Sequence, residues 1–249
     1  LICLISLFSN PKTKSMQVKG KHIIVTGGSL GIGKETAKNL IKKGAIVLVT
    51  GRSQERLDRT FGDIECHTIA FDIGDTSNIE HNAKKCLDLL NGQVDVLINN
   101  AGIGERKSIE ELSIDSFMKV FNVNVFGLAL FTKEMVPAMK NNNGGTIINI
   151  GSTASLKGYQ TGSIYASSKF AVRCLTQCWQ AELRPYNIRV CQINPSEVTT
   201  AFGSPDRIER NEVHNKLTSK EISHAITSAI EMDDRGFINE LNVWATNPF

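Results

Sequence analysis

The sequence predicts a single α/β domain built on a doubly wound, seven-stranded parallel sheet with helices on both faces. Three observations predict it: short apolar runs alternate with amphipathic stretches, several runs are almost wholly aliphatic, and no linker or repeat divides the 249 residues. A run that is apolar at every position indicates a strand covered on both faces. Alternation of strands and helices indicates right-handed crossovers and a parallel sheet.

The elements follow in order along the chain. Gly44 is expected to cap the first helix at its C-terminus, Pro185 to end the long fifth helix, and Thr218 to open the last helix in a capping box with Glu221. The predicted strands cover residues 23–26, 45–49, 66–71, 94–98, 146–150, 188–193 and 241–245. The predicted helices cover residues 32–43, 53–61, 76–91, 113–141, 163–184 and 219–232.

Composition and charge argue against several classes of protein. A formal net charge of +3 with no long basic run gives no reason to expect nucleic acid or a membrane surface as partner. The six cysteines are scattered without metal-ligand spacing, so we expect no metal and a reducing, cytoplasmic compartment. Residues 1–8 are apolar but too few to span a bilayer. We expect residues 1–15 to lie outside a domain covering 16–249; a signal segment is the alternative.

A glycine-rich turn follows the first predicted strand and opens the first predicted helix. It reads Thr26-Gly-Gly-Ser-Leu-Gly-Ile-Gly33, with Gly27, Gly31 and Gly33 at the key positions. In this context the glycines allow a sharp turn, close approach of a pyrophosphate and close helix–strand packing. The free N–H groups at the helix N-terminus favour phosphate. The turn therefore predicts a dinucleotide site, with a purely structural turn as the alternative.

A second constellation predicts proton transfer. Tyr165 and Lys169 lie four residues apart on one predicted helix, and so on one face of it. A neighbouring ammonium favours the phenolate, which should lower the pKa of Tyr165 towards the working range. Ser152 follows the fifth predicted strand and could hydrogen-bond a carbonyl oxygen and the oxyanion formed from it. Thr153 and Ser155 are alternatives by position.

These motifs, with Asn99-Asn-Ala-Gly102 between them, resemble the conventional short-chain dehydrogenase/reductase family over residues 18 to about 246. The resemblance implies a Rossmann fold and an oxidoreductase that interconverts a ketone and a secondary alcohol. It implies that Tyr165 is the acid/base, that Lys169 also binds the nicotinamide ribose, and that family spacing selects Ser152. It further implies that Asn124 holds a relay water. Asn122 is a rival, but the spacing to Gly127 favours Asn124.

The end of the second strand bears on the choice of cofactor. NAD-binding relatives place an acidic residue where this chain has Gly51, and Arg52 follows it. A guanidinium can grip a 2′-phosphate through charge-assisted hydrogen bonds. NADP(H) is therefore favoured and NAD(H) is possible, since Arg52 could be a solvated arginine. The glycine turn lacks the basic residue beside Ser29 that many NADP-dependent relatives carry.

The resemblance also implies further cofactor contacts. Asp72 matches the residue that contacts adenine, and the Asn99–Gly102 turn either stabilises the sheet or contacts the cofactor. Val198 and Thr200 match positions that contact the carboxamide, although Ser196 replaces the usual glycine after Pro195. The expected cofactor-binding set is Gly27, Ser29, Gly31, Ile32, Gly33, Arg52, Ser53, Asp72, Asn99, Ala101, Gly102, Tyr165, Lys169, Pro195, Val198 and Thr200.

Residues 201–217 are expected to form a substrate lid. Its charges, which include Arg207, Glu209 and Arg210, are expected to be a solvated face. The C-terminal segment resembles the carbonyl and hydroxy-acid dehydrogenase branch more than the main acyl-carrier-protein reductases, which argues against an acyl-carrier substrate. The expected substrate is a carbonyl, 3-oxoacyl or hydroxy-acid compound. An NAD-dependent alcohol dehydrogenase and a non-catalytic dinucleotide sensor are the alternatives.

A homodimer or homotetramer is expected from the resemblance, since helices 113–141 and 163–184 pair across a two-fold axis in relatives. Five side chains on these helices could serve that interface or the core. They are Phe131, Met135, Leu175, Cys178 and Trp179.

Overall fold

The computed structural model describes residues 17–204 and 206–248 of one α/β domain. The expected extension over residues 1–15 lies outside the described residues. All seven strands are parallel and form one sheet in the order β3-β2-β1-β4-β5-β6-β7. The predicted fold class is therefore confirmed.

The strands lie within about two residues of their expected positions. One difference bears on the site: the second strand continues two residues further, to Gly51, and so carries the chain to the expected cofactor edge. The strands are β1 (His22–Val25), β2 (Ile46–Gly51), β3 (His67–Ala70), β4 (Val96–Asn99), β5 (Gly145–Ile150), β6 (Ile188–Pro195) and β7 (Glu240–Val243).

The helices lie where they are expected, but some of their turns are π-helical or 3₁₀-helical and not α-helical. The expected helix over 113–141 is one continuous rod, but its middle turn, η3 (Asn122–Gly127), is a π-helix. A glycine is required at its end, because a Cβ on Gly127 would lie 2.0 Å from the carbonyl oxygen of Ile73. The α-helices are α1 (Gly31–Lys42), α2 (Gln54–Phe61), α3 (Ile79–Leu89), α4 (Ile114–Phe121), α5 (Leu128–Asn141), α6 (Ser163–Leu183) and α7 (Ser219–Ile230).

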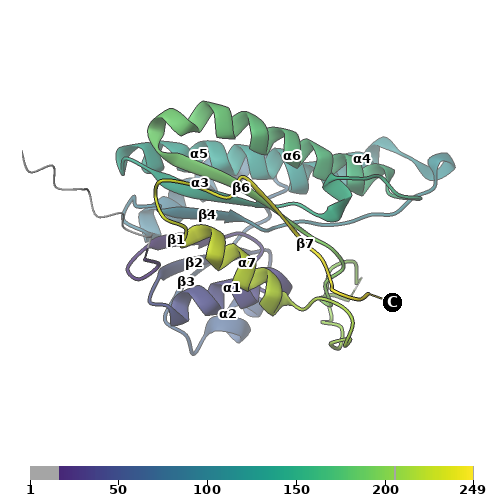
Figure 1. Cartoon of the computed structure of the whole chain (residues 1–249), viewed down its shortest axis with the longest axis horizontal. Coiled ribbons are helices and arrows are strands. Elements are labelled where there is room, and N and C mark those ends of the chain that lie inside the picture. Colours follow the sequence, from purple (N-terminus) through teal and green to yellow (C-terminus); the bar gives the residue numbers. More distant parts are fainter. Residues whose placement is uncertain (1–16, 205, 249) are drawn as a thin grey trace, which may run out of the picture.

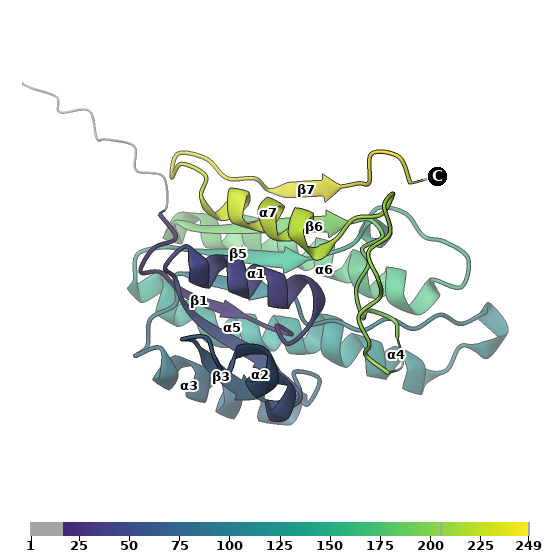
Figure 2. The same cartoon turned by 90° about the horizontal axis from the view of Figure 1, so that it is seen from below.

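The molecule has three layers, with helices on both faces of the sheet (Figures 1 and 2). Helices α1, α2 and α7 cover one face, where Leu40, Phe61 and Ile226 are buried in one apolar cluster. Helices α3, α5 and α6 cover the other face, where Phe131 and Met135 belong to a second cluster. This burial is the physical reason that the sheet strands are apolar at almost every position.

The second cluster shows which side chains of the helices over 114–141 and 163–183 serve the core, the alternative use being a subunit interface. Phe131 and Met135 are fully buried, so they belong to the core rather than to a subunit interface. Cys178 is exposed on α6, and Trp179 is partly buried against the core. The helix over 114–141 is also long and apolar enough to cross a membrane by length and composition, a test that the core helices of globular proteins pass too.

The strand order places β1 beside both β2 and β4. From β1 the chain adds β2 and β3 on one side of the sheet, and from β4 it adds the remaining strands on the other side. The reversal point lies between the carboxyl ends of β1 and β4. Crevices at such reversal points are where open α/β sheets bind ligands. The glycine-rich turn, which follows β1, and the Asn99–Gly102 turn, which follows β4, both lie at this point.

Candidate active site

Helix α6 brings the predicted proton donor to the turn that follows β5. The hydroxyl groups of Tyr165 and Ser152 lie close enough for Ser152 to lower the pKa of the tyrosine. Ser152 begins a short 3₁₀ turn, where its Oγ accepts from the N–H of Ala154 at 3.1 Å. Ser155 is fully buried, and its Oγ accepts from the Ser152 N–H at 3.2 Å. Of the candidate hydroxyls in this turn, that of Ser152 therefore meets Tyr165, and Ser155 supports it.

Lys169 lies one turn beyond Tyr165 on the same face of α6. Its buried Nζ donates to the carbonyl oxygen of Ile150 at 2.7 Å and lies 5.8 Å from the centre of the Tyr165 ring. Burial lowers the pKa of Lys169 to about 8. The ammonium is thus held against the end of β5, within reach of the site but with one of its hydrogens already used.

The pKa of Tyr165 departs from the sequence-based expectation. We expected the lysine to lower it, but the pKa of Tyr165 is raised to about 12, chiefly by burial, against the lowering effect of the Ser152 hydrogen bond. Desolvation disfavours the charged phenolate. Burial is therefore the dominant influence on the pKa of Tyr165, and Lys169 Nζ donates to the Ile150 carbonyl instead.

Asn124 occupies the π-helical turn η3 and is buried. Its side chain is fixed at both ends: Oδ1 accepts from the N–H of Ile103 at 2.9 Å, and Nδ2 donates to the Ile103 carbonyl and to Ser168 Oγ. A Cβ on Gly102 would lie 3.4 Å from Asn124 Oδ1 and 3.7 Å from Lys169 Nζ. Asn124 and Lys169 thus border the same backbone position, and π-turns of this kind are frequent at functional sites.

The glycine-rich turn is tied to the end of β4. Gly27 has φ +64, and a Cβ there would lie 2.7 Å from the Cα of Ala101, so no larger residue fits. Asn100, which the sequence analysis did not single out, donates from Nδ2 to the carbonyl oxygens of Thr26 and Gly27 at 2.9 and 3.0 Å. The Asn-Asn pair in the motif was the available signal. Asn100 therefore holds the turn that is expected to receive the pyrophosphate.

Asn99 points the other way. Its Nδ2 donates to Thr132 Oγ1 and Asn149 Oδ1 at 2.8 and 2.9 Å, and the residue is buried. These bonds favour the structural alternative for Asn99 over a cofactor contact. Among the other predicted contacts, Asp72 is exposed and accepts from the N–H of Gly74, and Thr200 packs beside Gly31.

A lid carboxylate occupies the N-terminus of α1. Glu209 accepts from the N–H of Gly31 at 2.9 Å and from Lys34 Nζ at 2.7 Å. This corrects the expectation that the lid charges form only a solvated face. The same N–H is expected to bind pyrophosphate, and a carboxylate satisfies it for the same reason, since the helix N-terminus favours negative charge. No sequence pattern signals a contact between residues 178 positions apart.

Positive charge gathers where β2 ends. Arg52 is exposed after Gly51, and Ser53 caps α2 by accepting from the N–H of Arg56 at 3.2 Å. Arg207 of the lid is half-buried, and its pKa is lowered by burial and then by the nearby charges of Arg52 and Arg56. Three arginines thus approach one another at the position where cofactor choice is expected to be decided.

The lid also reaches Tyr165, and in Figure 2 it runs across the ends of the strands. The ring of Phe202 lies 5.5 Å from the ring of Tyr165, centre to centre. A Cβ on Gly104 would lie 3.0 Å from the Phe202 ring. The lid is anchored by Arg210, which donates to the carbonyl oxygens of Val198 and Thr200 at 2.8 and 3.0 Å. The aromatic ring of Phe202 therefore packs against the predicted proton donor, Tyr165.

Comparisons with known proteins agree with this geometry. The family model described as short chain dehydrogenase matches residues 21–211. Mouse 3-ketodihydrosphingosine reductase is 33% identical over 210 residues, which are 80% of this chain and 62% of that protein. The chain thus spans about three fifths of the length of this curated relative, and 62% of its counterpart from cattle.

Solved structures give the same result over the whole domain. An alcohol dehydrogenase from the archaeon Thermococcus sibiricus, complexed with 5-hydroxy-NADP, has a TM-score of 0.84 at 27% identity and covers 92% of this chain and 97% of its own. A 3-ketoacyl-(acyl-carrier-protein) reductase from Brucella melitensis, complexed with NADH, has a TM-score of 0.82 at 26% identity over 93% and 100% of the two chains. The chain described here belongs to the short-chain dehydrogenase family.

Proposed function

We propose that this chain is an oxidoreductase that interconverts a ketone and a secondary alcohol with NADP(H). The observation that carries the proposal is the placement of the Tyr165 and Ser152 hydroxyl groups beside each other, near the buried ammonium of Lys169. A proton donor, a hydroxyl that can share the carbonyl oxygen, and a cation that stabilises the phenolate are what this reaction needs from a protein.

The protonation states of the site suit reduction. With a pKa of about 12, Tyr165 keeps its proton at neutral pH and can give it to the oxygen of a ketone. Lys169, with a pKa of about 8, is mostly charged below that pH and stabilises the phenolate left behind. Asn124 borders the lysine on its inner side and is the proposed support for a relay water. The bound nicotinamide cofactor supplies or accepts the hydride.

The cofactor half of the cleft fits a dinucleotide phosphate. The N–H of Gly31 already binds one anion, the Glu209 carboxylate, which supports pyrophosphate binding at the same place. Arg52, with Arg56 and Arg207 near it, supports binding of a 2′-phosphate. The last residue of β2 is Gly51, where NAD-binding relatives have an acidic residue. A carboxylate at that position would repel the 2′-phosphate, and this chain has none there.

The proposed substrate is a ketone that carries an apolar chain. The names of the mouse and Brucella relatives both describe a ketone at carbon 3. The lid presents exposed apolar side chains at Phe202, Ile208 and Val213, which would be covered by such a chain. We also propose a homo-oligomer, because Phe126 and Leu130 of the long helix and Phe170 of α6 remain exposed.

Purified protein incubated with NADPH or NADH and a panel of ketones, graded by chain length, tests the proposal. We expect NADPH oxidation that depends on the ketone and rises with chain length. Oxidation of the matching secondary alcohols with NAD⁺, without turnover of NADPH or NADP⁺, would favour the NAD-dependent alcohol dehydrogenase. Tight NADPH binding without turnover on any ketone or alcohol would favour a dinucleotide sensor.

A further inference from the structure

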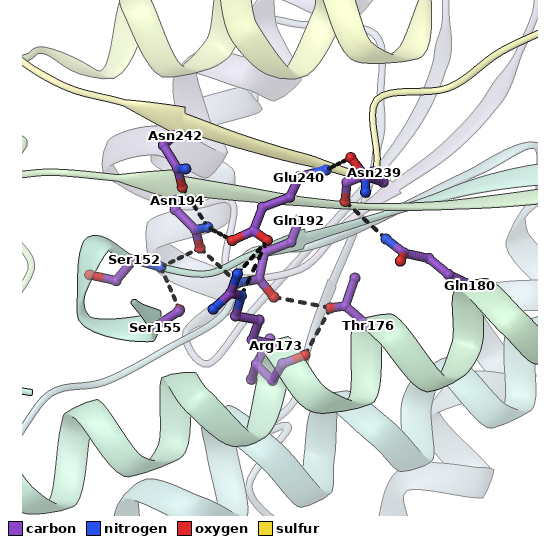
Figure 3. Close-up of polar contacts among 11 residues, drawn as sticks. Ser152, Ser155, Arg173, Thr176, Gln180, Gln192, Asn194, Asn239, Glu240 and Asn242 are labelled. Atoms are coloured by element: carbon purple, nitrogen blue, oxygen red, sulfur yellow. Dashed lines mark hydrogen bonds and ion pairs between the residues drawn. The ribbon is translucent and has the colours of Figure 1, made fainter. Parts of the chain in front are cut away.

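The polar face of α6 continues beyond the proposed catalytic pair. Tyr165, Lys169 and Arg173 are spaced by four residues and so lie along one side of the helix. Arg173 donates from Nε and Nη2 to Oε2 of Glu240, at 3.2 and 2.9 Å. Glu240 is the first residue of β7. The helix that carries the proton donor is therefore linked to the last strand of the sheet (Figure 3).

The second oxygen of the same carboxylate reaches β6. Glu240 Oε1 accepts from Nδ2 of Asn194 at 2.7 Å, and Asn242 Oδ1 accepts from the same nitrogen at 2.9 Å. On its other side, Asn194 Oδ1 accepts from Gln192 Nε2 at 2.7 Å and from the Ser152 N–H at 3.2 Å. Asn194 is completely buried and all its amide positions are used. Its orientation is thus fixed, and Ser152 is fixed to it.

The backbone before Ser152 is shaped for this contact. A Cβ on Gly151 would lie 2.1 Å from Asn194 Oδ1 and 2.7 Å from Gln192 Nε2, so only glycine allows the amide to approach. On the other side, the Ile150 carbonyl accepts from Lys169 Nζ at 2.7 Å. The turn that ends β5 is therefore held from two sides, by the proposed catalytic lysine and by Asn194.

We propose that Glu240 is a positioning residue for the ketone–alcohol reaction. Its carboxylate joins Arg173 of α6 to Asn194 of β6 and so fixes Ser152 beside Tyr165. These residues form a ring: Ser152 lies beside Tyr165, α6 leads from Tyr165 to Arg173, and hydrogen bonds lead back through Glu240 and Asn194 to Ser152. The proposal rests on the reaction proposed above.

The ring does not act mainly as a source of stability. The side chains of Arg173 and Glu240 are 34% and 19% exposed, and a partly exposed ion pair contributes little to folding free energy. The ring contributes by fixing the position of Ser152, because a displacement of about 1 Å in a reacting group can cost on the order of 100-fold in rate. Loss of Glu240 should thus affect turnover more than folding.

A double-mutant cycle tests the route through the serine. Glu240→Ala should lower kcat roughly 10-fold with the NADPH dissociation constant unchanged, because Ser152 is displaced and the cofactor site is not. In a Ser152→Ala background the same change should have no further effect. Glu231→Ala is the control. Glu231 lies at the end of α7, and the substitution breaks its ion pair with Lys43 but should leave kcat unchanged. An unchanged kcat in Glu240→Ala, or an equal loss in both backgrounds, overturns the proposal.

A second measurement needs no turnover. Amide hydrogen exchange at the Ser152 N–H, followed without cofactor or substrate, should be faster in Glu240→Ala than in wild type and unchanged in Glu231→Ala. If wild-type protein reduces no ketone, the proposed function fails, and this measurement still decides the proposal about Glu240. Equal exchange rates overturn it.

Arg173→Met opens the ring from the helix side while keeping an unbranched side chain, so it serves if Glu240→Ala does not fold. It should raise the Ser152 exchange rate and lower kcat in the same direction. Unchanged values would overturn the link to α6.

Discussion

The two ends of the candidate site, at Tyr165 and at the glycine-rich turn, are held by different kinds of contact. At the catalytic end, buried side chains hold one another: Lys169 bonds to Ile150, and the Ser152 N–H bonds to Asn194, which is itself fully bonded. At the cofactor end, Asn100 holds the glycine-rich turn, but the groups expected to meet the ligand include the exposed side chains of Arg52 and Glu209. The site is therefore preorganised where the proposed reaction would develop charge, and it carries exchangeable contacts where the proposed cofactor would enter and leave.

The two ends also differ in which protein groups a bound substrate or cofactor would have to displace. At the catalytic end, the lid side chain that lies beside Tyr165 is the uncharged ring of Phe202. At the cofactor end, Glu209 satisfies the N–H of Gly31 before any phosphate does. Substitutions at the two ends should therefore separate cleanly, the first changing kcat and the second changing the dissociation constant of the cofactor.

The largest effect is expected at the proton donor. Tyr165→Phe should lower kcat about 10²–10⁴-fold, because only the transferable proton is lost. The NADPH dissociation constant and the far-ultraviolet circular dichroism should stay at their wild-type values. A variant with at least half of the wild-type kcat would show that another group is the acid.

The next effect is expected at the cofactor end. Arg52→Asp should weaken NADPH binding roughly 10–100-fold, because a charge-assisted hydrogen bond of about 1.5–3 kcal/mol is lost. Binding of NADH, which lacks the 2′-phosphate, should change little. Fluorescence titration with both cofactors measures this.

Arg59→Asp is the matched control, because this exposed arginine lies in the last turn of α2 and carries the same charge change. A wild-type protein that already prefers NADH, or an equal response of both variants, would remove the case for NADP.

A change in the opposite direction is expected at the lid. Glu209→Ala should tighten NADPH binding about 10-fold, because the carboxylate no longer competes for the N–H of Gly31. Glu212→Ala, which loses only a 3.7 Å contact with Lys220, is the control for removing one lid charge. Weaker binding in Glu209→Ala would mean that the carboxylate supports the cofactor site instead of occupying it.

The smallest effect is expected from pH. The pKa of Lys169 is lowered to about 8, so its charge is complete well below that pH and is lost as pH rises through it. The value of kcat/KM for ketone reduction should therefore fall about twofold between pH 7 and 8 and more steeply above. Initial rates at constant ionic strength measure the profile. A flat profile through about pH 9 would contradict the role of the lysine charge.

Much of the fold could be predicted from the sequence, because the aliphatic runs and the glycine-rich turn are local signals. The π-turn at Asn122–Gly127 could not, since helical periodicity does not reveal one extra residue in a turn. The pKa of Tyr165 was predicted in the wrong direction, because the spacing of two residues gives their proximity but not their burial.

The candidate site divides in the same way. The motif residues Tyr165, Lys169 and Ser152 could be named because their spacing is regular. The supports could not: Asn194 and Glu240 are 46 positions apart, and their contact exists only after β6 and β7 pair. One usable signal was present, since Gln192 and Asn194 are amides at the end of an otherwise mainly apolar strand and required partners there.

The pairing of β6 with β7 has a consequence for folding. Parallel neighbours cannot form through a short hairpin, and here the lid and α7 lie between Gln192 and its partner Glu240. Closing such a long connection is entropically unfavourable before its contacts form. During refolding, the helices should therefore recover their signal early, and a competent active site should appear only when the seventh strand has docked.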